Sequence, residues 1–316
     1  MADNDTTGIE FLLLGLSMTW EQRVMTFVIF LLIYLLTILA NILIIALVRV
    51  DRSLRKPMYF FLSNFSFLEI WYTSVTIPKM LADFLSKRRS ISENGCIAQF
   101  YFLFFFGAME NLLLSVMALD RFVAICYPLR YPAVMNDRMC AQLVGGCWIG
   151  SCVALLMPAV PMSKLSFCGP LVMDHIFCDF SPLLKLSCTR NSFSEISFLF
   201  LAWVVILGCF TLIMVSYVFI ILTILRMPSA AGRQNAFATC ASHLLVVFIY
   251  YGTVIFMYIR PSAHESYYLD KVVSIFYAVV TPLLNPIIYS LRNQEVKAAL
   301  KRTIIKLKGL KRKERH

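Results

Sequence analysis

The stretch Asn111–Cys126, NLLLSVMALDRFVAIC, is mainly apolar up to Leu119 and then places an acid and a base, Asp120 and Arg121, side by side. An apolar run of this kind is typical of a membrane-spanning helix. A charged pair at its end indicates the point where such a helix reaches the membrane surface. We therefore ask whether the rest of the chain contains further spans.

The composition favours a membrane protein. Of 316 residues, 59% are apolar and only 15% are charged, whereas a soluble domain is about half apolar and about a quarter charged. Seven segments are long and apolar enough to cross a bilayer of about 30 Å. They are Val24–Val48, Met58–Met80, Cys96–Asp120, Met139–Val160, Ile196–Leu225, Phe237–Ile259 and Val272–Leu291. The predicted fold is an all-α, seven-transmembrane bundle over residues 24–291, between an N-terminal arm (1–23) and a basic tail (292–316).

The charges favour an N-terminus outside the cell. In that orientation the inner segments hold nineteen Lys and Arg and the outer segments ten, ten of the inner ones being in the tail. This distribution agrees with the positive-inside rule, although it depends on the tail. The arm has no secretory signal, and its sequence NDT at Asn4–Thr6 is a glycosylation acceptor at Asn4.

The basic tail predicts a short amphipathic helix on the inner leaflet. Apolar residues follow one another at helical spacing, with Lys and Arg between them: Val296, Leu300, Ile304 and Leu307. The alternatives are a frayed basic tail or a nucleic-acid contact. No nucleic-acid motif accompanies the charge, which argues for the membrane and against nucleic acid.

Two acidic residues lie inside predicted spans, where charge is costly. Counted at 1.5 Å per residue, Glu69 and Glu110 are both roughly 17 Å from the inner face, and Asn41 and Asn285 fall near the same depth. Two carboxyl groups at one depth either share a cation, a bound Na⁺, or share a proton. The equally weighted alternative is a pair of neutral acids that hydrogen-bond between helices. Pro286, with Pro282 four residues before it, also predicts a bend in the seventh span.

Five motifs in order carry a family resemblance. They are KPMYFFLSNFSFLEI at Lys56–Ile70, MALDRFVAIC at Met117–Cys126, SY at Ser216–Tyr217, AFATCASHL at Ala236–Leu244 and PLLNPIIYSLRN at Pro282–Asn293. The chain resembles an odorant receptor of the rhodopsin-like G-protein-coupled class, from about Phe11 to Asn293. The resemblance implies a plasma-membrane receptor, not an enzyme, that binds small volatile molecules and activates a stimulatory (Gs/Golf-type) G protein, raising cAMP.

The resemblance also implies the parts of an activation switch. Asp120 holds Arg121 at rest, and the freed guanidinium then meets the C-terminal helix of a Gα subunit. The other residues at matching positions are Tyr217 and Tyr289, which stabilise active Arg121, His243 in the inactive network, and Asn285 and Pro286. Taken alone, Asp120 and Arg121 are equally consistent with an interfacial pair. The chain departs from the family at Leu119 and Phe122, where tyrosines are usual, at Glu69, where aspartate is usual, and at Asn235–Thr239.

The family's outer cysteines also match. Four cysteines lie in predicted outer segments, and their positions alone leave three pairings open. The resemblance implies the bridges Cys96–Cys178 and Cys168–Cys188. No Cys-x-x-Cys pair occurs, so no zinc site is predicted. His175 is a lone histidine in this loop, and we expect it to be solvated.

The resemblance places the ligand pocket in the outer half, between helices three, five, six and seven. The residues at matching positions are Leu103, Phe104, Gly107, Ala108, Phe180, Leu201, Ala202, Val205, Tyr251, Val254, Ile255, Tyr258, Ile275 and Ala278. The alternative for each is plain helix packing. The set has no charge, which favours small, mainly apolar ligands with one carbonyl or hydroxyl and argues against amines. An opsin is disfavoured because Lys271 lies only at the outer end of the seventh span.

Other membrane functions lack their sequence signals. An intramembrane enzyme needs a nucleophile and base or metal ligands at matched depth, and His243 is the only histidine within a predicted span. A transporter usually shows an internal repeat, and none is present. A ligand-gated channel stays open as an alternative that an assay for current without G protein would detect.

Overall fold

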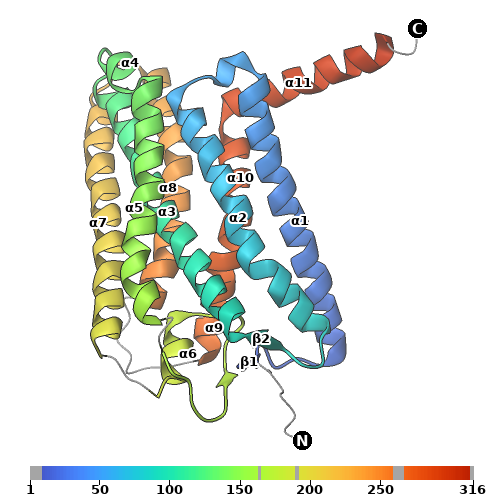
Figure 1. The fold of residues 1–316 in the computed structure, drawn as a ribbon. Coiled ribbons are helices and arrows are strands. Elements are labelled where there is room, and N and C mark those ends of the chain that lie inside the picture. The colour runs from blue at the N-terminus through green and yellow to red at the C-terminus, as the bar shows by residue number, and fades with distance from the viewer. Residues whose placement is uncertain (1–8, 163–164, 189–191, 259–266, 314–316) are drawn as a thin grey trace, which may run out of the picture.

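The computed structural model describes residues 9–162, 165–188, 192–258 and 267–313. Over these ranges the chain forms a bundle of seven long helices (Figure 1), which is the predicted fold class. Six helices are continuous: α1 (Trp20–Val50), α2 (Pro57–Leu85), α3 (Glu93–Cys126), α5 (Asp137–Met162), α7 (Ser192–Leu225) and α8 (Ala230–Tyr258). The seventh consists of α9 (Tyr267–Ile275), the π-helical turn η2 (Phe276–Val280) and α10 (Thr281–Arg292).

The helices extend beyond the apolar runs because capping residues, not hydropathy, determine where they begin. The predicted arm was too long at its inner boundary, since α1 begins at Trp20 rather than Val24. Thr19 and Gln22 form a capping box there, each side chain bonding the other's backbone N–H. Ser92 caps α3 by accepting a hydrogen bond from the Gly95 N–H. Helix α3 therefore begins at Glu93, three residues before the predicted start at Cys96.

Five helices in the described ranges are long and apolar enough to cross a membrane. They include α1, α3 and parts of α5 and α7, together with Leu269–Ile288 of the seventh helix. The two others are less apolar for different reasons. Helix α2 contains Glu69, Lys79 and Asp83, and the apolar part of α8 is only His243–Met257. Both pack inside the bundle, where neighbouring helices cover polar groups.

One end of the bundle carries a small sheet that the sequence did not predict. Strand β1 (Glu10–Leu13) pairs antiparallel with β2 (Ser90–Ser92) and parallel with β3 (Val172–Met173). Phe11 and Leu13 of β1 point inward and are almost fully buried. Part of the predicted N-terminal arm is therefore a strand of this sheet. We call the sheet and the loop between α5 and α7 together the cap. We call this end, with the sheet and α6 (Phe180–Lys185), the sheet end (Figure 1).

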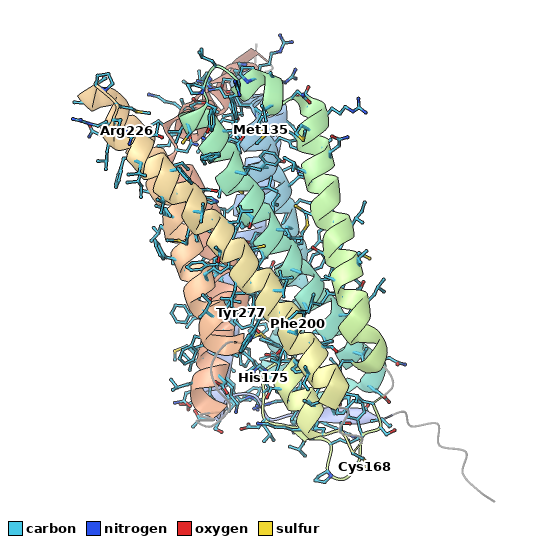
Figure 2. All side chains as sticks on the ribbon, turned by 90° about the vertical axis from the view of Figure 1, so that its left-hand side faces the viewer. Met135, Cys168, His175, Phe200, Arg226 and Tyr277 are labelled. Atoms are coloured by element: carbon cyan, nitrogen blue, oxygen red, sulfur yellow. A yellow bond between two sulfur atoms is a disulfide. The ribbon has the colours of Figure 1, made fainter. Side chains whose placement is uncertain are left out.

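The opposite end, which we call the tail end, carries short connections and the last helix. These are η1 (Arg52–Leu54), α4 (Tyr131–Val134) and α11 (Gln294–Lys313). Figure 2 shows Met135 and Arg226 at this end and Cys168 and His175 at the sheet end. The predicted amphipathic helix after Arg292 is confirmed as α11. Val296 is buried, Leu300 packs against the core and Ile304 is exposed.

Helix α3 lies at the centre of the bundle and contacts α2, α5, α7 and α8. Its residues Met109, Leu113, Leu114 and Ala118 are fully buried, so α3 is apolar on most of its surface. By contrast α1 and α7 expose many leucine, isoleucine and phenylalanine side chains. Exposed apolar surface of this kind is what lipid-facing helices present.

The seventh helix has a π-helical turn just before Pro282, whereas Pro286 lies inside the continuous helix α10. Proline has no N–H and cannot continue the backbone ladder. Just before it, the Thr281 N–H bonds the carbonyl of Phe276 five residues back, and the Thr281 hydroxyl donates to the same carbonyl at 3.1 Å. The widened turn therefore keeps these backbone groups satisfied inside the bundle.

Candidate functional site

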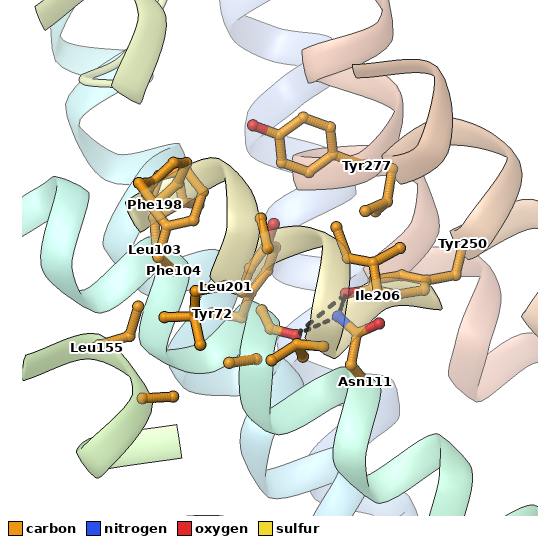
Figure 3. Close-up of a pocket in the computed structure, with 16 residues that line it drawn as sticks. Tyr72, Leu103, Phe104, Asn111, Leu155, Phe198, Leu201, Ile206, Tyr250 and Tyr277 are labelled. Carbon is orange, nitrogen blue, oxygen red and sulfur yellow. Dashed lines mark hydrogen bonds between the residues drawn. The ribbon is translucent and has the colours of Figure 1, made fainter. Parts of the chain in front are cut away.

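A cavity lies in the half of the bundle nearer the sheet end. Its volume, counted as room for the centres of water-sized atoms, is about 80 Å³, several times the ~10–15 Å³ that one water needs. Sixteen residues line it, and none of them is charged. Figure 3 shows that they come from several helices and surround a mainly apolar space. The cavity therefore suits a small neutral molecule.

Eight of the fourteen residues predicted for the pocket line this cavity. They are Leu103, Phe104, Gly107 and Ala108 of α3, Leu201, Ala202 and Val205 of α7, and Val254 of α8. Gly107 leaves a particular opening, because a Cβ built there would meet no atom within 4 Å. Seven of these eight residues belong to the α3 and α7 walls.

Five other predicted residues do not line the cavity. Phe180 stacks on Phe198 at a centroid distance of 3.9 Å in the cap. Tyr251 packs on Phe210, Ala278 is fully buried in η2, and Ile255 and Ile275 pack against the main core. The side chain of Tyr258 is outside the described residues.

The sequence missed eight lining residues. They are Tyr72, Asn111, Ala154, Leu155, Phe198, Ile206, Tyr250 and Tyr277. Tyr72 of α2 and the two α5 residues, Ala154 and Leu155, add walls from two helices that the prediction did not include. Tyr250 is next to the predicted Tyr251, and consecutive helix positions face about 100° apart. The two adjacent tyrosines therefore predicted an aromatic residue of α8 in the cavity wall, but not which of the two lines it.

A hydrogen-bonded pair forms the polar part of the cavity wall. The Asn111 side-chain amide donates to the Tyr250 hydroxyl at 2.7 Å and to the Gly107 carbonyl at 2.8 Å. The Tyr250 hydroxyl in turn donates to the same carbonyl at 3.1 Å. The amide orientation follows from these contacts, since only its NH₂ can donate to a carbonyl. The pair joins α3 to α8 directly below the cavity.

A buried polar layer lies next to the cavity, toward the tail end. The Asn285 amide donates to Glu69, and both side chains are almost fully buried. Glu110 is also buried and close enough to Glu69 for electrostatic interaction. One carboxyl oxygen of each acid has no hydrogen-bond partner among the described residues. Asn41 does not join them, because its amide donates to the Thr37 carbonyl of its own helix at 3.0 Å.

At the tail end the predicted acid–base pair is in contact. The Arg121 Nε atom donates to the Asp120 carboxylate at 3.0 Å, and the side chain of Asp120 is only 1% exposed. Tyr217 lies close enough to Arg121 for an electrostatic interaction. Its hydroxyl is 2.7 Å from Nδ1 of His243, with the two rings stacked. The Asp120–Arg121 contact is the one expected from the resemblance, and its role in activation stays a prediction. The side chain of Tyr289 is outside the described residues.

One contact of this pair was missed. The hydroxyl of Tyr131, in α4, donates to the second Asp120 oxygen at 2.7 Å. Burial is the main reason that the pKa of Tyr131 is raised, with the Asp120 carboxylate beside it as the next cause. A tyrosine in a short polar connection gives no sequence signal for this role. Asp120 therefore has two partners, one of them outside the helix.

At the sheet end two disulfides attach the loop between α5 and α7. They join Cys96 to Cys178 and Cys168 to Cys188, with Cα–Cα distances of 5.4 and 5.7 Å, the pairings that the resemblance implied. Gln99 adds a polar bridge. Its amide donates to the Val75 carbonyl at 3.1 Å, and its oxygen accepts from the Cys178 N–H at 3.0 Å. The loop is thus fixed to α2 and α3.

His175 is buried in this cap rather than solvated, so the sequence expectation was wrong. Its Nδ1 atom is 2.9 Å from the Phe177 carbonyl and its Nε2 atom is 3.3 Å from the Ser274 hydroxyl. Burial lowers its pKa below the ordinary value. Beside it, Lys271 pairs with Asp174 at 2.5 Å and donates to the Gly15 carbonyl at 2.9 Å. These contacts join the N-terminal arm, the loop and α9.

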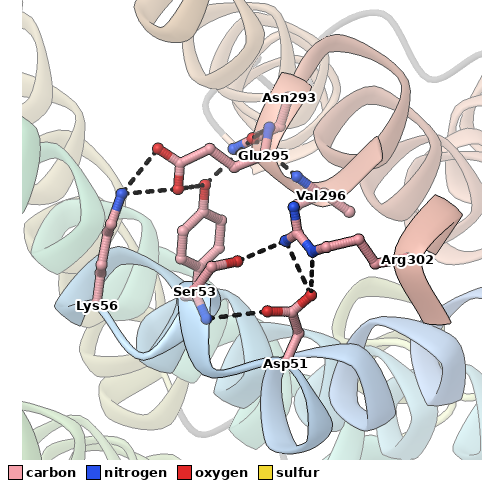
Figure 4. A network of polar contacts seen from close by, with 8 residues as sticks. Asp51, Ser53, Lys56, Asn293, Glu295, Val296 and Arg302 are labelled. Carbon is pink, nitrogen blue, oxygen red and sulfur yellow. Dashed lines mark hydrogen bonds and ion pairs between the residues drawn. The ribbon is translucent and has the colours of Figure 1, made fainter. Parts of the chain in front are cut away.

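The tail end is connected differently, through ion pairs between η1, α2 and α11 (Figure 4). Arg302 pairs with Asp51 at 2.8 Å and donates to the Ser53 hydroxyl at 2.7 Å. Lys56 contacts Glu295 at 2.8 Å, and the side chains of both are about half exposed. The Ser53 backbone N–H is the largest cause that lowers the pKa of Asp51 to about 2. Asn4 lies outside the described residues.

Comparisons with known proteins agree with this architecture. A family model described as olfactory receptor matches residues 30–307. The chain is 51% identical to human olfactory receptor 6Y1, covering 96% of this chain and 93% of the relative. It is 50% identical to human olfactory receptor 10C1 (97% and 98%) and 49% identical to rat olfactory receptor 226 (93% and 91%).

The fold is also similar to that of a solved receptor. A crystal structure of squid rhodopsin superposes with a TM-score of 0.69 at 16% identity, covering 92% of this chain and 87% of that one. At this identity the likeness shows the fold alone. The sequence matches extend over nearly the whole chain and include all seven helices. This multi-pass membrane protein belongs to the olfactory receptor family of G-protein-coupled receptors.

Proposed function

We propose that this protein is an odorant receptor that binds a small, mainly apolar volatile molecule in the cavity and activates a stimulatory, Golf-type G protein, raising cAMP. One observation carries the proposal. A single bundle holds an uncharged cavity near its sheet end and a partly buried Arg121–Asp120 pair at its tail end. The first can receive a neutral ligand, and the second can change partners when the helices move.

The proposed mechanism is a two-state equilibrium. At rest Asp120 neutralises Arg121, and Tyr131 holds Asp120 in place. A ligand that binds the active arrangement more tightly shifts the population toward it. In that arrangement Arg121 leaves Asp120 and meets the C-terminal helix of Gα, with Tyr217 and Tyr289 beside it. The orientation this requires has the sheet end and a glycosylated Asn4 outside, and α11 on the inner leaflet.

The polar layer is proposed to hold Na⁺ or a shared proton in the resting state. Each acid has a carboxyl oxygen without a hydrogen-bond partner among the described residues, and oxygen ligands of this kind suit a hard cation. Glu69, Glu110 and Asn285 would supply them, whereas Asn41 is committed to its own helix. Replacing sodium by choline in the medium, with Glu110→Gln as the variant, tests this part. Unchanged signalling in both cases would exclude the cation.

The main test is a screen of volatile compounds in cells that carry Golf and a cAMP reporter. We expect activation by uncharged compounds and none by amines. Arg121→Ala should abolish the response while the receptor stays at the cell surface. A tag at the N-terminus should be accessible on intact cells. A ligand-evoked current without G protein would contradict the proposal and favour a channel.

The pocket is tested by filling it. Gly107→Leu adds a side chain into the open space of the cavity, so it should remove the response to every active compound without lowering surface expression. Gly208→Leu is the matched control, because Gly208 is exposed on α7 and a Cβ there also meets no atom within 4 Å. Agonists that still activate Gly107→Leu normally would show that ligands bind elsewhere.

A further inference from the structure

Tyr72 of α2 is the lining residue whose polar group is available to a ligand. The residue is 3% exposed and lines the cavity (Figure 3). Its ring packs within the main apolar core. Over the described part of the chain, its hydroxyl makes no hydrogen bond, although buried hydroxyls normally have a partner. A buried, unpaired hydroxyl beside a cavity indicates that its partner is supplied by a bound molecule.

The other polar side chains of the lining are already engaged. The amide of Asn111 and the hydroxyl of Tyr250 bond each other and the Gly107 carbonyl. The remaining Asn111 oxygen is buried within the wall, and Tyr277 has interactions of its own. Tyr72 therefore contributes a lining hydroxyl that has no hydrogen bond to the described part of the protein.

From this arrangement we infer that Tyr72 determines specificity by hydrogen-bonding the single polar group of the odorant. The inference rests on the proposed function and deepens it. A phenol donates readily and has no charge, so it selects an acceptor oxygen: the carbonyl of an aldehyde, ketone or ester, or an alcohol hydroxyl. The remaining wall is apolar and receives the hydrocarbon part of the same molecule.

The position of Tyr72 requires a control for indirect effects. It is three residues from Glu69 on the same helix face, so a change at Tyr72 could act through the polar layer instead of the ligand. Tyr72→Phe removes only the oxygen. Because that oxygen has no hydrogen-bond partner among the described residues, the variant should keep the surface expression of the wild type. A loss of surface expression would show that the hydroxyl is structural and would overturn the inference.

The experiment compares matched pairs of probes. Volatile ketones, aldehydes and esters are tested beside hydrocarbons of the same shape, for example acetophenone beside α-methylstyrene. We expect the oxygen-containing members to activate, and Tyr72→Phe to raise their half-maximal concentrations by about tenfold, as the loss of one hydrogen bond to a ligand does. Tyr101→Phe is the control, since its hydroxyl lies outside the cavity, 4.0 Å from the Cys152 sulfur.

Each other outcome has a definite meaning. If oxygen-containing agonists are blocked by Gly107→Leu but unaffected by Tyr72→Phe, the inference fails and the proposed function stands. The same follows if hydrocarbons activate as well as their oxygen-containing partners. If no probe activates, or if Gly107→Leu leaves activation intact, the proposed pocket itself fails and the role of Tyr72 fails with it.

Discussion

The two ends of the bundle are held together by different kinds of contact. At the sheet end, two disulfides, a three-stranded sheet and a buried histidine attach the loop between α5 and α7. At the tail end, η1 and α11 meet through ion pairs such as Lys56–Glu295, whose side chains are about half exposed. Disulfides contribute several kcal/mol (about 2–4), whereas exposed ion pairs contribute about 0–1 kcal/mol.

This difference indicates which end can move. A fixed sheet end keeps the cavity in one shape, so that ligands are discriminated by fit and by Tyr72. The tail end can rearrange because its contacts are individually weak and can be exchanged for others. A receptor needs both properties, since binding requires a defined pocket and signalling requires a surface that can rearrange.

The largest effect is expected from breaking the covalent contacts of the sheet end. The bridges Cys96–Cys178 and Cys168–Cys188 close segments with sequence separations of 82 and 20. In the chain-entropy model their removal costs about 4.5 and about 3.3 kcal/mol. We therefore expect Cys96→Ser to abolish surface expression and Cys168→Ser to reduce it less. Flow cytometry of a tagged receptor measures both, and equal losses would contradict the loop-length argument.

At the tail end, Tyr131→Phe should raise basal activity. The Tyr131 hydroxyl donates to Asp120 at 2.7 Å, and a hydrogen bond to a charged group contributes about 1.5–3 kcal/mol. Its loss from the resting state should shift the equilibrium toward the active state by about tenfold or more. Tyr127→Phe is the control, because Tyr127 is exposed, its ring contacts Phe122, and its hydroxyl makes no hydrogen bond to the described residues. The measurement is cAMP without ligand, at equal surface expression.

A pH titration tests whether the cap depends on neutral His175. Burial lowers its pKa below 6.5, assisted by the charge of Lys271 and opposed by Asp179 and Asp270. Because the folded pKa is the lower one, the contribution of His175 to stability is complete above the unfolded pKa and is lost as the pH falls toward the folded value. The melting temperature of the purified receptor should therefore fall between pH 8 and pH 5.

The variant His175→Asn separates this effect from the other titrating groups. It cannot gain a proton in this range, so its melting temperature should depend less on pH than that of the wild type. Ser274→Ala, which removes only the hydroxyl near Nε2, should keep the pH dependence. Identical profiles for the wild type and His175→Asn would mean that the cap does not sense this proton.

The sequence predicted the fold well because membrane spans depend on local composition. It predicted much less of the contacts between distant segments. Strand β1, EFLL, has three apolar residues in a row, so it lacks the alternation that signals a strand. Its partner strands have only three and two residues. The arm therefore gave no sign that it forms part of the cap.

The site shows the same limit at the level of single residues. Arg121 and Asp120 are adjacent in a motif, and their contact could be predicted. The hydrogen bond from Tyr131 crosses a turn, and the choice of Tyr250 over Tyr251 depends on how α8 is rotated. Tyr72 belongs to a helix that the resemblance did not place at the pocket. Such details follow from packing between helices, which no local pattern records.

The smallest effect is expected for the ion pairs of α11. Arg302 contacts Asp51 and Ser53, but its side chain is 47% exposed. Salt screens a pair at such a surface, and its contribution is about 0–1 kcal/mol. Arg302→Ala should therefore change the half-maximal concentration of an agonist by about fivefold at most. Lys301→Ala is the matched control, because Lys301 is the exposed neighbour on α11 and forms no ion pair with the residues that the structure describes.

The dependence on salt separates an ion pair from a general effect of charge. In washed membranes the Arg302→Ala effect should shrink as the ionic strength rises, because the pair it removes is already screened in the wild type. Lys301→Ala, which removes the same charge from the same helix, measures the contribution of attraction to anionic lipid alone. If the two variants behave alike at every salt concentration, the Arg302–Asp51 contact adds nothing specific. The tail end would then be held by the apolar contacts of Val296 and Leu300 with the core. In that case its ion pairs would not stabilise it, and the tail end would be held even more weakly, relative to the disulfide-linked sheet end, than the ion pairs indicate.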